Sequence, residues 1–182
     1  LVSLAHFATN GKYFLRNFYL KSKNSILKPK VSGPAAYVFP ADDPRLGGQA
    51  QLLRLMQQQG CEIHKATAPF SVTIPAKKGG KAETKQFPAG SYILRMDQPY
   101  SRIADMMLDY QYWATNDPQT DIYDDTAWTF GELGNVQTIR VTDVGVLSAQ
   151  MEKVNGDVKA LSGVSGSGST FIVNHNADNA LV

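Results

Sequence analysis

The sequence predicts an α/β fold, because short runs of strand-forming residues alternate with helical patterns along its 182 residues. A strand at 35–39, a helix at 44–59 and a second strand at 61–64 follow one another directly. A helical connection of this kind normally joins parallel strands in a βαβ unit. We therefore expect a small mixed sheet with a parallel pair at its centre, flanking helices, and a further amphipathic helix at the N-terminus.

The N-terminal helix is expected over residues 4–27, where large apolar side chains return every three or four residues. Pro29 ends the pattern. Fully burying a large apolar side chain contributes roughly 1.5–3 kcal/mol, so this face needs a partner. We expect it to dock on a neighbouring domain, fold back, pair with a second copy, or fray. The face consists of Phe7, Phe14, Leu15, Phe18, Ser22 and Ile26.

The βαβ unit has clear boundary signals. The run AAYVF at 35–39 is rich in strand formers. Asp42 or Asp43 can cap the helix that follows, and Pro44 suits its first turn. Gly60 is placed to end it. The buried face of this helix is expected to contain Leu46, Ala50, Leu53 and Met56.

The remaining elements are shorter. Asp97 is a suitable helix cap, a polar loop is expected at 113–127, and residues 142–160 fit neither helical nor strand periodicity. The other elements are strands at 70–74, 91–96, 136–141 and 170–173, a helix at 99–112, and a Ser- and Gly-rich linker at 162–169. The chain thus divides into an N-terminal helix at 1–32, an α/β domain at 33–150, and a linker with the first strand of a further domain at 151–182.

The composition is that of a globular domain, with 43% hydrophobic residues, 19% charged residues and a net charge of +2. It contains no dense basic arm, so we expect no nucleic-acid partner. No apolar run approaches the roughly 20 residues of a membrane span, and residues 1–8 lack the features of a signal peptide. The single cysteine, Cys61, excludes an internal disulfide and a zinc site built mainly from thiolates.

No catalytic or metal-ligating set can be assigned. The histidines, His6, His64 and His175, have no Glu or His three or four residues away, as a helical zinc pair requires. Cys61 and His64 are three residues apart, and such residues point to opposite faces of a strand. We therefore expect Cys61 to be buried and unreactive.

The 113–127 loop offers the one candidate ligand groove. Its acidic residues lack the spacing of a calcium loop, so they are expected to be solvated. Aromatic residues around it could line a peptide or glycan groove, or could form a local core that holds the loop. These residues are Tyr110, Tyr112, Trp113, Tyr123 and Trp128.

Several short runs carry a family resemblance. They are FLRNFYLKS at 14–22, PADD at 40–43, LLRLM at 52–56, FPAGSYILRMDQPY at 87–100 and YDDTAWT at 123–129. Together they resemble the region behind the catalytic domain in large bacterial zinc carboxypeptidase-like proteins of the M14 metallopeptidase family. The resemblance covers roughly residues 14–148.

The resemblance implies that this chain is a non-catalytic part of a larger secreted hydrolase. The family holds zinc with a His-x-x-Glu pair and a distant His, and neither His6 nor His64 has that spacing. Arg16 and Asn17 reverse the order of the family's carboxylate-binding Asn-Arg pair. No catalytic or metal residue is therefore expected in this chain, and the zinc is expected in the catalytic domain of the parent protein.

The expected function is that of an accessory region that packs on the peptidase domain and shapes access to its site. Its expected partners are the catalytic domain of the same polypeptide and, for the isolated chain, a second copy. The resemblance implies an extracellular or periplasmic location. The alternative function is an independent peptide- or glycan-binding module that uses the aromatic loop at 110–128.

Overall fold

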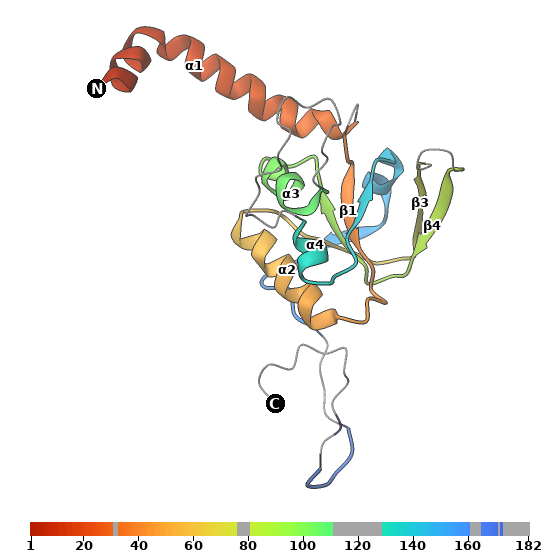
Figure 1. Cartoon of the computed structure of the whole chain (residues 1–182). Coiled ribbons are helices and arrows are strands. Elements are labelled where there is room, and N and C mark those ends of the chain that lie inside the picture. The colour runs from red at the N-terminus through yellow and green to blue at the C-terminus, as the bar shows by residue number, and fades with distance from the viewer. Residues whose placement is uncertain (31–32, 76–80, 111–128, 161–164, 171, 173–182) are drawn as a thin grey trace, which may run out of the picture.

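The protein has the α/β fold that the sequence predicts, with helices on one face of a five-stranded sheet and a hairpin on the other (Figure 1). This computed structural model describes residues 1–30, 33–75, 81–110, 129–160, 165–170 and 172. The sheet contains, in spatial order, β6 (Ile139–Val141), β1 (Ala36–Phe39), β5 (Tyr92–Arg95), β2 (His64–Ala66) and β7 (Met151–Lys153).

Every ladder of the sheet is antiparallel, so the expected parallel pair at its centre is wrong. β1 and β2 each pair with β5 and therefore run in the same direction, as their helical connection requires. The apolar strand β5 lies between them, and its Ile93 and Leu94 are fully buried. The arrangement is a split βαβ unit, and local sequence patterns do not reveal which strand separates the two.

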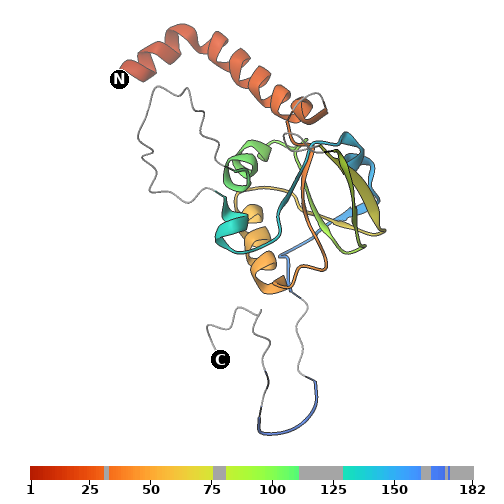
Figure 2. The same cartoon turned by 45° about the vertical axis from the view of Figure 1, so that its right-hand side comes forward.

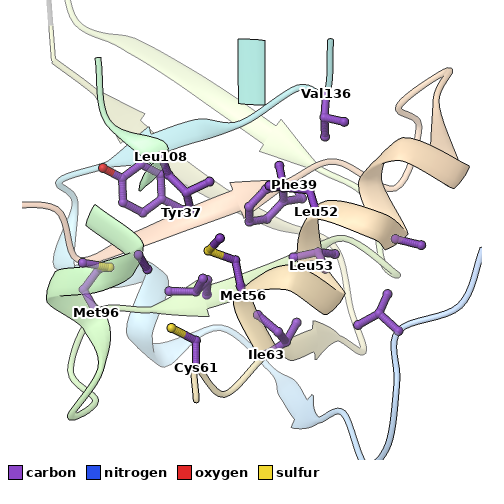
Figure 3. Packing of buried hydrophobic residues seen from close by; sticks show 14 residues of the cluster. Tyr37, Phe39, Leu52, Leu53, Met56, Cys61, Ile63, Met96, Leu108 and Val136 are labelled. Atoms are coloured by element: carbon purple, nitrogen blue, oxygen red, sulfur yellow. The ribbon is translucent and has the colours of Figure 1, made fainter. Parts of the chain in front are cut away.

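The helix side of the sheet holds the larger of the two apolar clusters (Figure 3). Tyr37 and Phe39 of β1 pack there with Leu53 and Met56 of α2 (Leu46–Gln58). Helix α2 confirms the predicted helix at 44–59. The layer is completed by α3 (Ser101–Leu108) and α4 (Phe130–Leu133).

The opposite face of the sheet is covered by the antiparallel hairpin of β3 (Phe70–Ile74) and β4 (Glu83–Phe87). Val38 of β1 is buried on this side with Phe87, whose ring stacks on Phe70 at 5.2 Å between centroids. The sequence predicts β3 but not β4. The run ETKQF is mostly polar and exposed, and only Phe87 is buried, so it lacks an apolar strand signal.

Several boundaries differ from the predicted ones. Helix α3 spans a shorter range than the expected 99–112, and Asp97 forms a salt bridge with Arg95 instead of capping it. Strand β7 and the buried Val158 extend the folded unit past residue 150, where the sequence placed its end. Of the strand expected at 170–173, only residues 170 and 172 are described, and neither is in a strand. A 3₁₀ helix, η2 (Val144–Ser148), precedes β7.

Helix α1 (Val2–Leu27) confirms the predicted N-terminal helix and projects from the rest of the molecule (Figure 1, Figure 2). Its C-terminal end continues into η1 (Lys28–Lys30) and lies beside the body, whereas its N-terminal half extends away from it. Within this fully described helix no residue is buried. The helix therefore does not fold back onto the core of its own chain.

Candidate functional site

The aromatic groove suggested by the sequence falls largely outside the described residues. Tyr112, Trp113, Tyr123 and Trp128 belong to that part of the chain. Tyr110 is described: it follows α3, has a side chain that is 48% exposed, and lines a small cavity of about 270 Å³. Of the five aromatic residues expected to line a groove, only Tyr110 lies within the described part of the chain.

Cys61 is buried in the core and His64 is half-buried on β2, as is typical of residues with a structural role. The Cys61 thiol donates a hydrogen bond to the Tyr100 carbonyl oxygen at 3.7 Å and belongs to the core cluster (Figure 3). Burial raises its pKa to about 11, so the thiol stays protonated at neutral pH. His64 is half-buried on β2, and burial, followed by the charge of Arg95, lowers its pKa. The structure confirms the expected burial of Cys61 and offers no activated thiolate at this position.

In the described parts of the chain, no three His, Cys, Asp or Glu side chains gather closely enough to hold a metal ion. Among the helices in those same parts, none combines the length and the apolarity needed to cross a membrane.

The apolar face of α1 is the outstanding exposed surface. Gly11 leaves room above the Phe7 ring, which meets the Phe14 ring edge-to-face with centroids 5.3 Å apart. Phe14 and Phe18 are 56% and 65% exposed, although such rings are normally well covered in globular proteins. Further exposed apolar residues on this helix are Leu4, Tyr13, Leu15, Tyr19, Leu20, Ile26 and Leu27.

The charge on this segment is entirely positive. Residues 1–30 contain no Asp or Glu. Cations near the C-terminal end of the helix interact favourably with its dipole. The signal was present in the sequence, but the net charge of +2 averages these cations with acidic residues elsewhere. The six basic residues are Lys12, Arg16, Lys21, Lys23, Lys28 and Lys30.

Together these features make α1 an exposed helix that is both cationic and apolar and that contacts the rest of the molecule only near its C-terminal end. A comparison of the chain with known protein families, curated proteins and solved structures finds no match.

Proposed function

We propose that this chain is a non-catalytic accessory module that docks onto a catalytic domain through α1. The observation that carries the proposal is a 26-residue helix without a buried residue, which presents a continuous aromatic and aliphatic face to solvent. Contiguous exposed apolar patches of this kind mark interaction sites. The helix-in-groove mode of recognition uses anchors spaced by three, four or seven residues, and Phe7, Phe14 and Phe18 are spaced by seven and four.

The partner that the resemblance suggests is the catalytic domain of an M14-type zinc carboxypeptidase within the same polypeptide. On this proposal the zinc ion and the reacting groups belong to that domain, in an extracellular or periplasmic protein. The α/β body would then lie beside the peptidase domain and shape the access of substrates to its site.

The charge of residues 1–30 specifies the surface that α1 fits. Six cations and no carboxylate require a groove with an apolar floor and an acidic rim. Burying the exposed parts of Phe14 and Phe18 would contribute roughly 1–2 kcal/mol each. The rim charges would mainly raise the association rate and make it sensitive to salt.

The test is a titration of the purified chain with the separately purified catalytic domain of the same gene product. The double variant Phe14→Ser and Phe18→Ser should weaken binding by about thirtyfold or more, since two apolar anchors are lost. Tyr13 is 64% exposed and is rotated round the helix by about 100° from Phe14 and about 140° from Phe18, off the line of the three Phe anchors, so Tyr13→Ser is the matched control.

The control variant should bind as the unchanged chain does. Absence of binding by the unchanged chain, or equal weakening by Tyr13→Ser, would refute docking through this face. Circular dichroism on each variant separates lost binding from lost helix.

A further inference from the structure

A groove of about 750 Å³ lies between α2 and α4, and most of the α2 residues that line it lie outside the core cluster. Its lining is partly apolar and partly polar, and none of the lining residues belongs to α1. Gly48 allows the close approach of the two elements, because a methyl group there would lie 3.3 Å from Val136. The apolar lining consists of Leu52, Leu55, Phe130 and Leu133.

One end of the groove carries a fixed guanidinium group. Oriented with its amide oxygen toward Arg45, Asn135 accepts hydrogen bonds from Nη2 at 2.8 Å and from Nε at 3.1 Å. Asn135 has a φ of 50° and follows the end of α4, where the Val136 N–H donates to the Gly131 carbonyl oxygen at 2.8 Å. This closure is a Schellman motif, which fixes Asn135 and thereby Arg45. A neutral amide holds the guanidinium, so its charge is not compensated there.

A second guanidinium group, that of Arg54, lies further along the same helix. Its side chain is exposed and has no ion-pair partner among the described residues. Among the described residues, no Asp or Glu side chain lines the groove. The nearby Asp43 is buried and accepts hydrogen bonds from the backbone N–H groups of Arg45 and Gln137. The groove therefore combines an apolar floor with two available cations.

The spacing of the arginines defines the ligand. Nine residues of helix give a rise of ~13.5 Å between the Cα atoms of Arg45, at the N-cap of α2, and Arg54, and both long side chains reach the groove from its two sides. In an extended peptide, side chains four residues apart are separated by ~13.4 Å and point to the same side. The residue midway between them also points to that side and meets the floor. The amide side chains of Gln51 and Gln58 line the groove and can donate to and accept from peptide groups.

We infer that the α2–α4 groove binds an extended acidic peptide segment, with carboxylates at its first and fifth positions and an apolar side chain at its third. Arg45 and Arg54 bind the two carboxylates, and the apolar residue packs between Leu52 and Leu55. The interaction holds whether or not α1 docks on a partner.

The probe is the acetylated and amidated peptide Asp-Ser-Leu-Ser-Asp, titrated into the full chain while backbone amide signals are followed by NMR. Signals of α2 and α4 should shift in a saturable way. Arg54→Gln and Arg45→Gln should each weaken binding by about tenfold to a hundredfold, as expected for a lost charge-assisted hydrogen bond. Lys81→Gln removes an exposed cation just before β4, outside both the groove and α1, and should leave the affinity unchanged.

Two comparison peptides separate the parts of the ligand. Asn-Ser-Leu-Ser-Asn tests the carboxylates and Asp-Ser-Ser-Ser-Asp tests the apolar residue, and both should bind more weakly than the probe. Equal binding of the Asn peptide, or equal weakening by Lys81→Gln, would overturn the inference. Tighter binding of laurate at the same signals would assign the groove to an acyl carboxylate and overturn the peptide assignment.

Discussion

Asp43 should be a main determinant of how α2 is joined to the segment between α4 and β6. Its carboxylate is only 3% exposed and accepts two backbone hydrogen bonds, from Arg45 N–H and Gln137 N–H, each at 2.7 Å. The two donors are 92 residues apart in the sequence. Asp43→Ala removes both acceptors and leaves these two backbone donors without their carboxylate partner.

The expected cost follows from these two bonds. A hydrogen bond to a charged group contributes roughly 1.5–3 kcal/mol, so losing both should destabilise the fold by about 3–6 kcal/mol. For a domain of this size, 1 kcal/mol lowers Tm by about 2–4 °C, which gives a fall on the order of 10 °C. Asp43→Asn keeps one acceptor oxygen and should recover about half of the loss.

Thermal unfolding followed by circular dichroism, together with urea titration, measures this loss. Asp42 is the adjacent residue and is exposed, so Asp42→Ala provides the matched control and should change Tm by less than about 2 °C. If Asp43→Ala unfolds at the same temperature as Asp42→Ala, the two hydrogen bonds do not stabilise the fold and the reasoning fails.

Two further outcomes follow from neighbouring residues. Gly47→Ala should raise the free energy of unfolding by about 0.5–1 kcal/mol, because a methyl group there meets no atom within 4 Å, whereas Gly48→Ala should gain less against Val136 at 3.3 Å. Urea titration of both variants checks this, and an equal gain would contradict the close approach at Gly48. Cys61 has a folded-state pKa of about 11, above its ordinary value of 9.0, so the unfolded state loses the thiol proton first as the pH rises. Its contribution to stability should therefore be constant below about pH 8 and fall between about pH 9 and 11, which Cys61→Ala should abolish in the pH dependence of unfolding.

The sequence predicts elements that carry a strong local apolar pattern. Helix α1, helix α2 and strand β1 are confirmed for this reason. Strand β4 and helix α4 are not predicted, because ETKQF at 83–87 is polar and FGEL at 130–133 is too short for helical periodicity. The position of β5 between β1 and β2 depends on contacts between distant segments, which periodicity does not encode.

The candidate sites also divide into one that a local sequence pattern reveals and one that depends on contacts between distant segments. The apolar face of α1 is readable from the spacing of Phe7, Phe14 and Phe18. The α2–α4 groove is not, because it requires Asn135 to orient Arg45 across a separation of 90 residues. That orientation depends on a positive φ at Asn135, which the Gly134-Asn135 pair makes accessible but which no single residue type identifies.

The charge distribution also bears on how isolated chains would associate. Residues 1–30 carry six basic residues and no acidic one, and the whole chain has a net charge of +2, so the remainder has a net charge of −4. Two α1 helices placed side by side would bring like charges together, whereas α1 against the remainder of another copy, whose excess negative charge comes from the four Asp residues at 117–125, would pair opposite charges. We expect the second arrangement in the isolated chain, with Phe14 and Phe18 as its apolar anchors.

Sedimentation as a function of salt distinguishes these arrangements. Contact between α1 and the body of another copy should weaken from 0.05 M to 0.5 M salt, because added ions screen the attraction, while contact between two α1 helices should strengthen as their repulsion is screened. The first contact is head-to-tail and does not close on itself in a dimer, so it should also give a broad series of species rather than a single one. A monomer at every concentration and salt level would show that α1 stays exposed in the absence of its partner. A sharp dimer that salt stabilises would show that the apolar face of α1 outweighs its charge.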